Sequence, residues 1–564
     1  MRLRRVLIEN FRGLKRLELD LDDITILIGE NNCGKTSVLE AIRIALSRAA
    51  MRRIGSFEDH DYHLADATSA PGDSGTLKII LEFIEGKQSE WPVEVVQGLA
   101  DAVVLDASGL YHLNFVLSSS WDRSLKEFIT DWNFVDANGK VLPRAKRPVV
   151  IGNLQNFVSV FYLTALRDAV RDFSPKSTFW GPFLRNPSIP DAIKTQLESE
   201  LVALNDKIIG AEKRLKQVSN SLEKAQKIVS LGQKDTISIE AIPSRIWDML
   251  SRAQVNVAAV TGASLPLVKH GAGTQSLATI FLFESFLAAG VNKPDPHTSF
   301  FLQIEEPEVH LHPSAIRSLW PTLAGSPEQK IIATHSGDLL SEVPLTAIRR
   351  LKRTTNGVEV RRLDPKALSP EETRKAQFHI RRHRGELFFA RVWLLHEGET
   401  EYWILSEVAR LAGIPIEENG IRLVEYANVG LAPLLKLADQ FGIQWHCLCD
   451  GDQQGKANAT AASGVLNGRS AADHISLLNE PNIEQYLCNA GFGAIYENNI
   501  SNQSAITAKP GHIDYWPQVL KSQQGKFKVP CAIKVIQAIE ANGIAAIPNF
   551  LVQVVNRAVA LSGV

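Results

Sequence analysis

The 564-residue sequence has little cysteine, little methionine and no long hydrophobic run. Its five cysteines are odd in number and, apart from Cys447 and Cys449, lie far apart, so they form neither a disulfide framework nor a CxxC zinc motif. No apolar segment is long enough to span a bilayer, and the first residues lack the apolar core of a signal peptide. These absences argue against a disulfide-stabilised secreted domain and a membrane protein, and they favour a cytoplasmic protein without membrane partners.

An excess of charge of one sign is also absent. The 61 Lys and Arg residues are balanced by 62 Asp and Glu residues, which leaves a formal net charge of −1. This balance excludes a polycation that holds nucleic acid by overall charge, although a local basic face remains compatible with it. The length, with 45% hydrophobic residues, predicts about three domain-sized units with more than one core.

A phosphate-binding loop is predicted near the N-terminus. Residues 24–28 are typical of a buried strand, residues 29–37 (GENNCGKTS) match the pattern GxxxxGK[ST], and helical sequence follows. Main-chain N–H groups of such a loop and the helix N-terminus bind phosphate, while Lys35 reaches the β- and γ-phosphates and the Thr36 hydroxyl binds magnesium. The predicted nucleotide-binding positions of the loop are Asn31, Asn32, Gly34, Lys35, Thr36 and Ser37.

Two later strands end in residues that suit ATP hydrolysis. Residues 299–306 form an apolar strand that ends in two carboxylates. Glu305 is expected to serve the magnesium ion, directly or through water, and Glu306 to polarise the attacking water. Residues 331–336 form a second buried strand, which ends at His335 and so offers a sensor for the γ-phosphate.

Five segments together resemble the ABC-type ATPases of the RecF, SMC and OLD group. They are IENFRG (8–13), the phosphate loop, HGAGTQ (270–275) before a predicted apolar helix (277–289), IEEPEVHLHP (304–313) and ATHS (333–336). In that group the glycine-rich signature turn of one subunit completes the ATP site of another. The resemblance therefore implies that Gly271, Gly273 and Gln275 bind nucleotide in trans, so that ATP turnover requires a dimer. Glu305 stands where many relatives have Asp, as is usual in the OLD branch, which leaves direct metal ligation open.

A long amphipathic helix is predicted over residues 191–229, between the ATPase halves. At 1.5 Å per residue it would be roughly 58 Å long, and Gly210 is the point where it is most easily bent or broken. Its apolar residues alternate at spacings of four and three: Leu197, Leu201, Leu204, Ile208, Ala211, Leu215, Val218, Leu222, Ala225 and Val229. This seam is typical of a coiled-coil dimerisation arm. An insertion at this point of the chain also resembles the dimerisation domain of OLD proteins. The alternative is a surface helix packed on its own domain.

Residues 349–391 are basic, with thirteen Arg or Lys residues against five Asp or Glu residues. Such a run is either a solvated face or a track for the phosphate backbone of DNA.

The C-terminal part contains a candidate metal centre. An apolar strand at 392–396 is followed by Glu397 and, four residues later, Glu401; a second strand is followed by Asp450 and Asp452. Carboxylates at the ends of two strands can converge on one hard cation, and oxygen ligands favour magnesium or manganese over zinc. Cys447 and Cys449 are expected in the core of the second strand rather than as ligands.

Strand-EGxTE followed by strand-DxD resembles the Toprim domain of topoisomerases, primases and OLD nucleases. In Toprim enzymes these acids place divalent metal at a phosphodiester, and the resemblance gives Glu397 a further role as catalytic acid or base. Two later segments resemble those of OLD nucleases. One points to Glu484 as a metal ligand, although a surface carboxylate is the alternative, and the other points to Lys528 as the catalytic lysine, with Lys526 and Lys534 still open.

The overall prediction is an α/β protein with an ABC-type ATPase domain, a helical dimerisation insertion and an α/β Toprim domain. The predicted parts are an ATPase domain in two pieces (1–175 and 240–345), the insertion (176–239), a basic linker (346–385) and the Toprim domain (386–564). The resemblance implies an ATP-binding, magnesium- or manganese-dependent endonuclease or nickase acting on double-stranded DNA.

The OLD relatives serve in anti-phage defence, including the nuclease subunit of the Gabija system and retron-linked effectors. They imply a homodimer or dimer of dimers and a helicase or reverse-transcriptase partner. Two other functions remain open. One is an ATP-switched, SMC/RecF-like repair scaffold with an inactive Toprim domain, and the other is a topoisomerase, which would need a delivered tyrosine.

Overall fold

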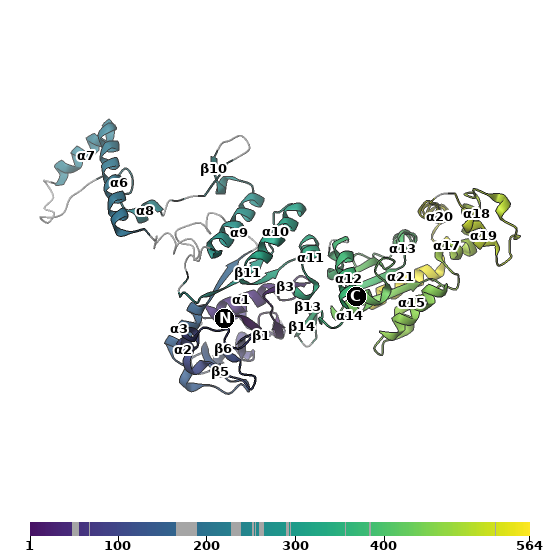
Figure 1. Cartoon of the computed structure of the whole chain (residues 1–564), viewed down its shortest axis with the longest axis horizontal. Helices are drawn as coiled ribbons and strands as arrows, with labels where there is room; N and C mark the ends of the chain where they lie inside the picture. Colours follow the sequence, from purple (N-terminus) through teal and green to yellow (C-terminus); the bar gives the residue numbers. More distant parts are fainter. Residues whose placement is uncertain are drawn as a thin grey trace. The chain divides into compact units, whose positions relative to one another are not determined.

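The computed structural model describes residues 1–47, 56–66, 68–164, 189–226, 239–250, 253, 255–258, 264–288, 293, 295–355, 357–382, 385–524 and 526–563. They form two compact units. Figure 1 shows their helices and strands, coloured along the sequence. The first unit comprises Met1–Val160, Phe301–Glu308 and Pro313–Val564, and the second comprises Phe161–Phe300 and Val309–His312. Within the described ranges, no helix has both the length and the apolarity that crossing a membrane requires.

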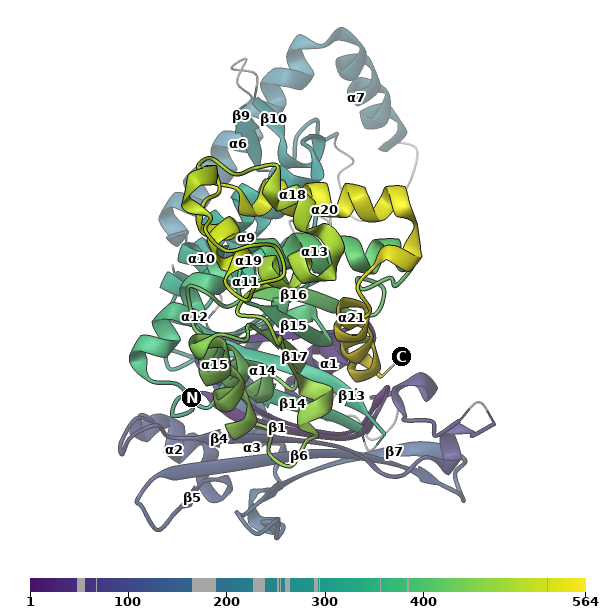
Figure 2. The ribbon, with the colours of Figure 1, turned by 90° about the vertical axis from the view of Figure 1, so that its right-hand side faces the viewer.

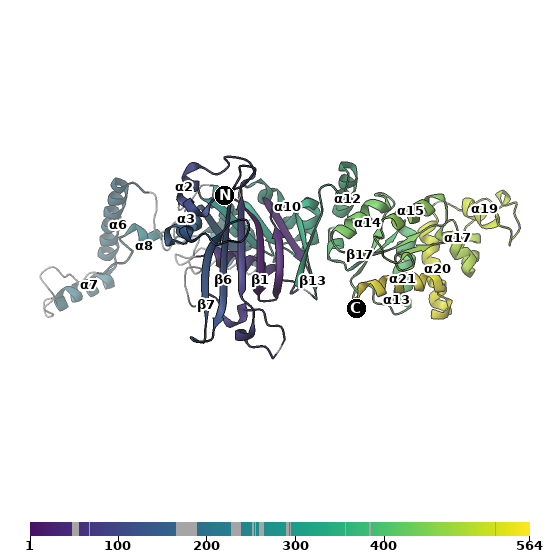
Figure 3. The ribbon, with the colours of Figure 1, turned by 90° about the horizontal axis from the view of Figure 1, so that it is seen from below.

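The first unit begins with an antiparallel sheet in the order β2-β1-β4-β6-β5, with β7 also paired to β6 (Figure 3). Its strands are β1 (Leu3–Phe11), β2 (Leu14–Asp20), β4 (Leu77–Ile84), β5 (Val104–Leu105), β6 (Tyr111–Asp122) and β7 (Glu127–Val135). Side chains alternate between the two faces of a strand, so that every second residue of β4, from Leu77 to Phe83, is fully buried. This sheet therefore has one face committed to the core.

The ATPase sheet is the second sheet of this unit, in the order β14-β13-β3-β12-β11-β8. Its strands are β3 (Ile24–Gly29), β8 (Val158–Leu163), β11 (Ser299–Glu305), β12 (Gln329–Ala333), β13 (Ile348–Thr354) and β14 (Gly357–Arg362). The strands β13, β3, β12 and β11 are parallel neighbours. The predicted phosphate loop, carboxylates and histidine all follow strands of this sheet. Because the carboxyl ends of parallel strands meet at one edge, these groups lie along the same edge.

Helix α1 (Lys35–Leu46) lies between the two sheets, in contact with β1 and β4 of the first and with β3 and β12 of the second. Its buried residues, including Val38, Leu39 and Ile42, recur at helical spacing. Helices α10 (Pro313–Gly325) and α11 (Gly337–Glu342) flank the following strands and contact each other. The smaller helices of this part are α2 (Val93–Leu99) and α3 (Pro148–Phe157).

The segment 346–385 is folded structure, and its prediction as a basic linker is wrong. It supplies β13, which pairs with the central strand β3, then β14 and helix α12 (Pro370–Arg382). Arg349 and Arg350 of β13 are only 1% and 5% exposed, so they are unavailable to a DNA backbone. These charged residues can be buried within the sheet because their guanidinium groups donate to carbonyl and carboxylate acceptors of the protein.

The Toprim domain is built on a parallel sheet in the order β16-β15-β17-β18 (Figure 2). Its strands are β15 (Val392–His396), β16 (Ile421–Glu425), β17 (Gln444–Cys449) and β18 (Ile475–Leu477). Helices α13 (Glu399–Leu411) and α21 (Asn549–Ser562) contact the sheet and each other, while α14 (Leu431–Gln440) and α15 (Gln453–Gly464) form another pair in contact with β17. Apolar runs such as Val392–Leu395 match a strand that is covered on both faces.

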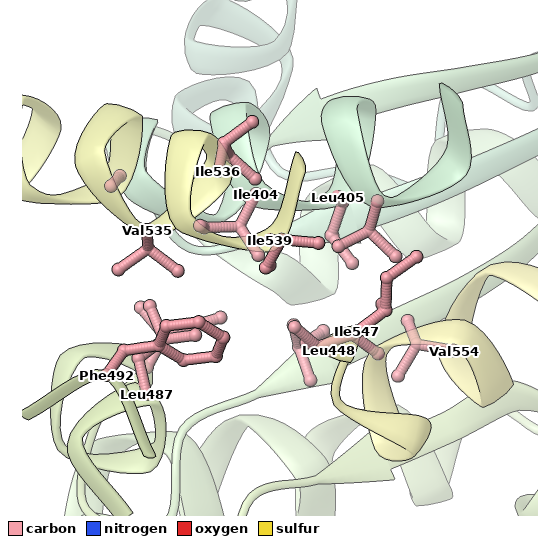
Figure 4. Packing of buried hydrophobic residues seen from close by; sticks show 14 of the residues in the cluster. Ile404, Leu405, Leu448, Leu487, Phe492, Val535, Ile536, Ile539, Ile547 and Val554 are labelled. Atoms are coloured by element: carbon pink, nitrogen blue, oxygen red, sulfur yellow. The ribbon is translucent and has the colours of Figure 1, made fainter. Parts of the chain in front are cut away.

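A single apolar cluster joins this sheet to the last helices of the chain (Figure 4). The later helices are α17 (Ile483–Leu487), α18 (Gly493–Glu497), α19 (Tyr515–Lys521) and α20 (Lys528–Asn542). Ile404 of α13, Leu448 of β17, Leu487 of α17 and Val535 of α20 are all fully or almost fully buried in it. Each such side chain contributes about 1.5–3 kcal/mol of burial free energy. The cluster therefore fixes α17 and α20, two helices that carry candidate site residues.

The second unit contains the predicted dimerisation helix, but not as one rod. Helix α6 (Asp191–Ala211) ends at Glu212, whose backbone is extended, and α7 (Lys213–Gln226) follows and contacts α6. The break lies two residues after Gly210, the weak point of the sequence. Val229 and the boundary at 175–176 lie outside the described residues.

Burial does not follow the predicted apolar seam of these helices. Leu204 and Val218 are 48% and 50% exposed, whereas Asn205 is buried. The amide of Asn205 bonds the main chain of Ile239 and Ala241, so it fastens the returning segment to α6. The remaining elements of this unit are α8 (Ile246–Leu250), β9 (Asn256–Ala258), β10 (Ser264–Pro266) and α9 (Ala272–Ala288). Whether the exposed leucines pair with a second copy stays a prediction.

Candidate functional sites

The phosphate loop has the strand-loop-helix geometry that the sequence predicts. Gly34 has φ +100°, a left-handed conformation that favours glycine, and a Cβ there would collide with Leu14. The Lys35 Nζ atom donates to the carbonyl oxygens of Gly29, at 3.0 Å, and of Glu30, at 3.1 Å. The lysine is thus folded back across its own loop, where phosphate oxygens would replace these carbonyls as acceptors.

The Thr36 hydroxyl donates a hydrogen bond to the Glu305 carboxylate. These two side chains come from α1 and from the end of β11, 269 residues apart in sequence. A hydroxyl and a carboxylate that meet beside a phosphate loop are oxygen ligands of the kind that Mg²⁺ takes in nucleotide sites. The pair therefore fits the predicted magnesium position. Glu306 follows with φ +43°, and its N–H donates to the Ala333 carbonyl at 2.8 Å.

Glu308 is a site residue that the sequence analysis did not single out. Its carboxylate accepts from the Thr334 hydroxyl at 2.8 Å and from the His335 N–H at 2.7 Å. Burial raises its pKa, and the Thr334 hydroxyl in turn accepts from the Ser336 N–H. The acidic loop after β11 and the turn after β12 are thereby tied together. Its only sequence signal is its place inside the EEPE motif.

His335 follows β12 on the side of the phosphate loop. Partial burial, followed by the positive charge of Lys35, lowers its pKa, so the imidazole is neutral at pH 7. Its ring stacks on Phe389, with the ring centroids 6.2 Å apart. Its main-chain N–H is bonded to Glu308 and its ring packs on Phe389. A neutral imidazole fixed in this way can donate one hydrogen bond to a phosphate oxygen.

The glycine-rich signature turn lies in the second unit. Gln275 donates its side-chain amide to the His270 carbonyl at 2.7 Å, which closes the turn at the start of α9. A Cβ on Gly273 would lie 2.6 Å from the His310 carbonyl oxygen, so only glycine fits there. Gly271, by contrast, has open space around it. The turn is locally well formed, and its action in trans stays a prediction.

The Toprim carboxylates follow the strands as predicted. Glu397 comes directly after β15, and Glu401 lies in the first turn of α13, where its Oε2 accepts from the Gly398 N–H at 3.1 Å. Asp450 comes directly after β17, and Asp452 caps α15 by accepting from the Gly455 N–H at 2.7 Å.

Two residues of the C-terminal helices join this acidic cluster. Glu484 of α17 is 2% exposed, which excludes the alternative of a surface carboxylate, and it accepts from the Thr400 hydroxyl at 3.2 Å. The Lys528 Nζ atom lies 3.0 Å from a Glu484 carboxylate oxygen. All three candidate lysines are exposed, and Lys528 is the one whose ammonium group lies at ion-pair distance from these acids. Thr400 was not recognised from the sequence.

Burial, and after it the charges of neighbouring carboxylates, raises the pKa values of this cluster. Burial, followed by the charges of Glu401 and Glu397, raises the pKa of Asp450 to about 8. Burial is also the main cause that raises the pKa of Glu401 to about 7, and burial with the charge of Asp452 raises that of Glu397. For Lys528, burial acts downward, but the charge and hydrogen bond of Glu484 outweigh it and raise the pKa. At pH 7 the protonated form of Asp450 is therefore favoured, and a bound cation would take the place of that proton.

The fit to a divalent metal can be judged from the carboxylate oxygens. Glu397 Oε2 is buried without a hydrogen-bond partner, which is unfavourable unless a cation or water takes it. No three metal-capable side chains among the described residues form a ready-made cage. The reason lies in the hydrogen bonds already described, because Glu401 and Asp452 cap their own helices and Glu484 binds Lys528. Carboxylate oxygens are donors of the kind that suits Mg²⁺ or Mn²⁺.

The buried cysteines behave as predicted. All five are free and buried, and the sulfur atoms of Cys447 and Cys449 lie 3.9 Å apart inside β17. They fill the core beneath Asp450 and are not directed at the cluster as ligands.

Comparison with known families and proteins follows the same two-part division. Residues 1–386 match the family described as "Protein of unknown function (DUF2813)", and residues 388–452 match "Overcoming lysogenization defect protein-like, TOPRIM domain". The chain is 29% identical over 99% of its length to the uncharacterized protein YbjD of Escherichia coli, which it covers to 98%.

Two relatives are named as nucleases. The chain is 23% identical over 85% of its length to endonuclease GajA of Bacillus cereus, which it covers to 81%. It is 24% identical over 80% of its length to the Old nuclease of Escherichia phage P2, which it covers to 77%. The resemblance and the α/β fold class inferred from the sequence are thereby confirmed: the chain belongs to the OLD family, with an ABC-like ATPase region of the DUF2813 family followed by an OLD-like Toprim domain.

Proposed function

We propose that this protein is an ATP-binding, divalent-metal-dependent DNA endonuclease or nickase that acts in anti-phage defence. The observation that carries the proposal is the acidic cluster of the Toprim domain. Carboxylates from β15, α13, β17 and α17 converge with Lys528, although burial and mutual repulsion make that arrangement costly without a cation. The OLD-like Toprim match and the nuclease names of two relatives also support a nuclease function.

The chain's own residues supply three parts of the proposed reaction. The carboxylates Glu397, Glu401, Asp450, Asp452 and Glu484 would hold Mg²⁺ or Mn²⁺, which supplies water activation and charge stabilisation at a phosphodiester. Lys528 offers a positive charge to the scissile phosphate. Glu397 would act as the acid or base, taking a proton from the attacking water and passing it to the leaving oxygen. Water adds to phosphorus, and the bond from phosphorus to the leaving oxygen breaks.

The ATPase half is proposed to bind ATP with magnesium at the phosphate loop. Thr36 and Glu305 would share the ion, Glu306 would polarise water, and His335 would contact the γ-phosphate. The second copy in a homodimer or dimer of dimers would provide Gly271, Gly273 and Gln275. We further propose double-stranded DNA as substrate, a helicase or retron reverse transcriptase as partner, and the cytoplasm as the place of action.

The test is cleavage of supercoiled plasmid by the purified full chain with Mg²⁺ or Mn²⁺, with and without ATP. We expect nicked or linear product that is lost with Glu397→Ala and retained with Glu399→Ala, because Glu399 is the exposed carboxylate between the two proposed ligands. Cleavage that survives Glu397→Ala would rule out the metal assignment. If the wild-type chain binds DNA in an ATP-dependent way but never cleaves it, the scaffold function replaces the nuclease. A covalent protein–DNA adduct after denaturation would instead indicate a topoisomerase.

A further inference from the structure

The buried side chain of Arg350 joins the ATPase sheet to the Toprim sheet. Its backbone lies on β13, opposite Ile28 of β3, one residue before the glycine that opens the phosphate loop. Its guanidinium group leaves the ATPase sheet and donates only to main-chain carbonyls of the Toprim domain. The acceptors are Phe388 (3.0 Å), Ala390 (2.8 Å), Phe441 (3.0 Å) and Gly442 (3.3 Å).

These carbonyls stand at the starts of the two strands that carry the metal-binding acids. Ala390 lies two residues before β15, which Glu397 directly follows, and Gly442 lies two residues before β17, which Asp450 directly follows. The strands are paired in parallel and are each about 17–20 Å long. One guanidinium therefore holds the amino ends of both strands, and stiff, paired strands carry that position to their carboxyl ends.

A second contact links the phosphate loop itself to the same strand. Glu30 follows Gly29 in the loop, and Arg391 directly precedes β15. The Arg391 Nε atom donates to Glu30 Oε1 at 2.8 Å, and Nη2 donates to Oε2 at 3.4 Å. The Arg391 carbonyl in turn accepts from the Gln444 N–H at 2.9 Å, at the start of β17.

The two contacts differ in their freedom to change. Arg350 is 5% exposed, and a buried guanidinium that lost its acceptors would be strongly unfavourable, so it acts as a fixed joint. The Glu30 and Arg391 side chains are 56% and 41% exposed and border a cavity of about 430 Å³, so this ion pair can open without disturbing a core. Nucleotide phosphates bound at the loop would add negative charge beside Glu30 and compete for Arg391.

We propose that Arg350 is a positioning residue of the Toprim site, and that the Glu30–Arg391 pair makes the position of Glu397 and Asp450 depend on the nucleotide at the phosphate loop. The inference rests on the proposed function, because it assigns a regulatory route to that metal site. It also gives a role to a stretch of arginines whose sequence is otherwise typical of a DNA-binding face.

The test is amide hydrogen exchange of the full-length chain, with and without ATP and Mg²⁺, followed in peptides that cover residues 392–397 and 444–450. The wild-type chain should change its exchange rates in both peptides by at least about twofold when ATP binds, and Lys35→Ala, which loses ATP binding, should not. Arg391→Gln and Glu30→Gln should still bind ATP and lose the response. Arg350→Met should raise basal exchange in both peptides and lose the response.

Arg349→Met is the matched control for Arg350→Met. Arg349 lies on the same strand and is 1% exposed, but its guanidinium bonds Asp22 and the carbonyls of Asp20 and Thr346, all in the ATPase part. This variant should respond to ATP like the wild-type chain. If Arg350→Met does not fold, the two variants of the exposed ion pair carry the test.

A wild-type chain that binds ATP without any change in these peptides would overturn the proposal, as would Arg391→Gln and Glu30→Gln variants that respond normally. The readout does not depend on cleavage. A chain that shows the exchange response but cuts no DNA under any condition therefore refutes the proposed nuclease while leaving the coupling in place, and the reverse outcome separates them equally clearly.

Discussion

The two candidate metal sites of this protein are built on opposite electrostatic principles. At the ATPase site, the half-buried Glu305 accepts a hydrogen bond from the Thr36 hydroxyl, and the Lys35 ammonium group lies within the phosphate loop. At the Toprim site, burial and the charges of neighbouring carboxylates raise the pKa of Asp450 to about 8, and Lys528 lies beside Glu484. The first site offers an ammonium group and main-chain donors to phosphates, whereas the second offers carboxyl groups that burial keeps protonated until a cation replaces the proton.

The difference also concerns completeness. The Toprim cluster draws all its groups from β15, α13, β17, α17 and α20 of one compact unit. The signature turn of the ATPase lies in the other unit and is predicted to act on a second copy. The expectation is that metal binding at the Toprim domain is a property of a single chain, while ATP turnover depends on assembly. Four experiments test this contrast, beginning with the one for which the largest effect is expected.

The largest effect is expected from Asp450→Asn. We expect cleavage to fall at least about 10²-fold, because an amide cannot replace a carboxylate on a hard cation. With a chelator present, however, the variant should melt at a higher temperature than the wild-type chain. The expected rise is about 2–4 °C for each kcal/mol that burying the Asp450 carboxyl costs the metal-free protein. Plasmid cleavage and thermal denaturation measure the two effects, with the exposed Asp473→Asn as control. A large drop in melting temperature would make Asp450 a structural residue.

Lys528→Met should reduce cleavage by about 10²-fold through the loss of positive charge at the scissile phosphate. The exposed Lys526→Met, two residues away, should cleave at the wild-type rate. Single-turnover cleavage at saturating metal distinguishes them, since a lysine that only holds Glu484 in place would alter the metal concentration needed rather than the maximal rate. Equal loss in both variants would mean that the segment, and not one ammonium group, matters.

Glu308→Gln should lower the rate of ATP hydrolysis by about tenfold and leave the affinity for ATP nearly unchanged. Glu308 orients the His335 main chain without touching the phosphate loop, and outer hydrogen-bond partners of this kind typically contribute factors of 10–100. Steady-state ATPase kinetics gives kcat and KM separately, and Glu328→Gln at the surface turn before β12 is the control. A variant with wild-type kcat would remove Glu308 from the site.

The smallest effect is a pH dependence of stability set by His446 in β17. Burial lowers the pKa of His446 to about 4, against about 6.5 in an unfolded chain. The unfolded chain then binds more protons between these values, so stability should be complete above pH 6.5 and fall as the pH drops towards 4, by about 1 kcal/mol at pH 5.5. Chemical denaturation at several pH values tests this, and His446→Gln should flatten that part of the profile. An unchanged slope would assign the acid sensitivity to other groups.

Much of both sites could be predicted because their residues follow strands. The loop after β3, the acids after β11, β15 and β17 and the histidine after β12 were all placed by a simple pattern, an apolar run followed by polar residues. Glu308 and Thr400 were missed because each acts through one long-range hydrogen bond, which leaves no periodic signal. The prediction of a single long helix was wrong because the heptad spacing continues past Glu212, where extended backbone follows the end of α6.

The types and spacing of the loop glycines, the lysine and the carboxylates were enough to predict phosphate and metal binding from the sequence alone. Only the tertiary structure decided which of those groups meet. Lys528 reaches Glu484 because an apolar core packs α20 against α13 and fixes α17 beside them. Arg349 and Arg350 become internal donors rather than a DNA-binding surface because β13 pairs with the central strand β3. Charge is a local property of a sequence, but burial, which decides what a charge can bind, depends on contacts between residues hundreds of positions apart.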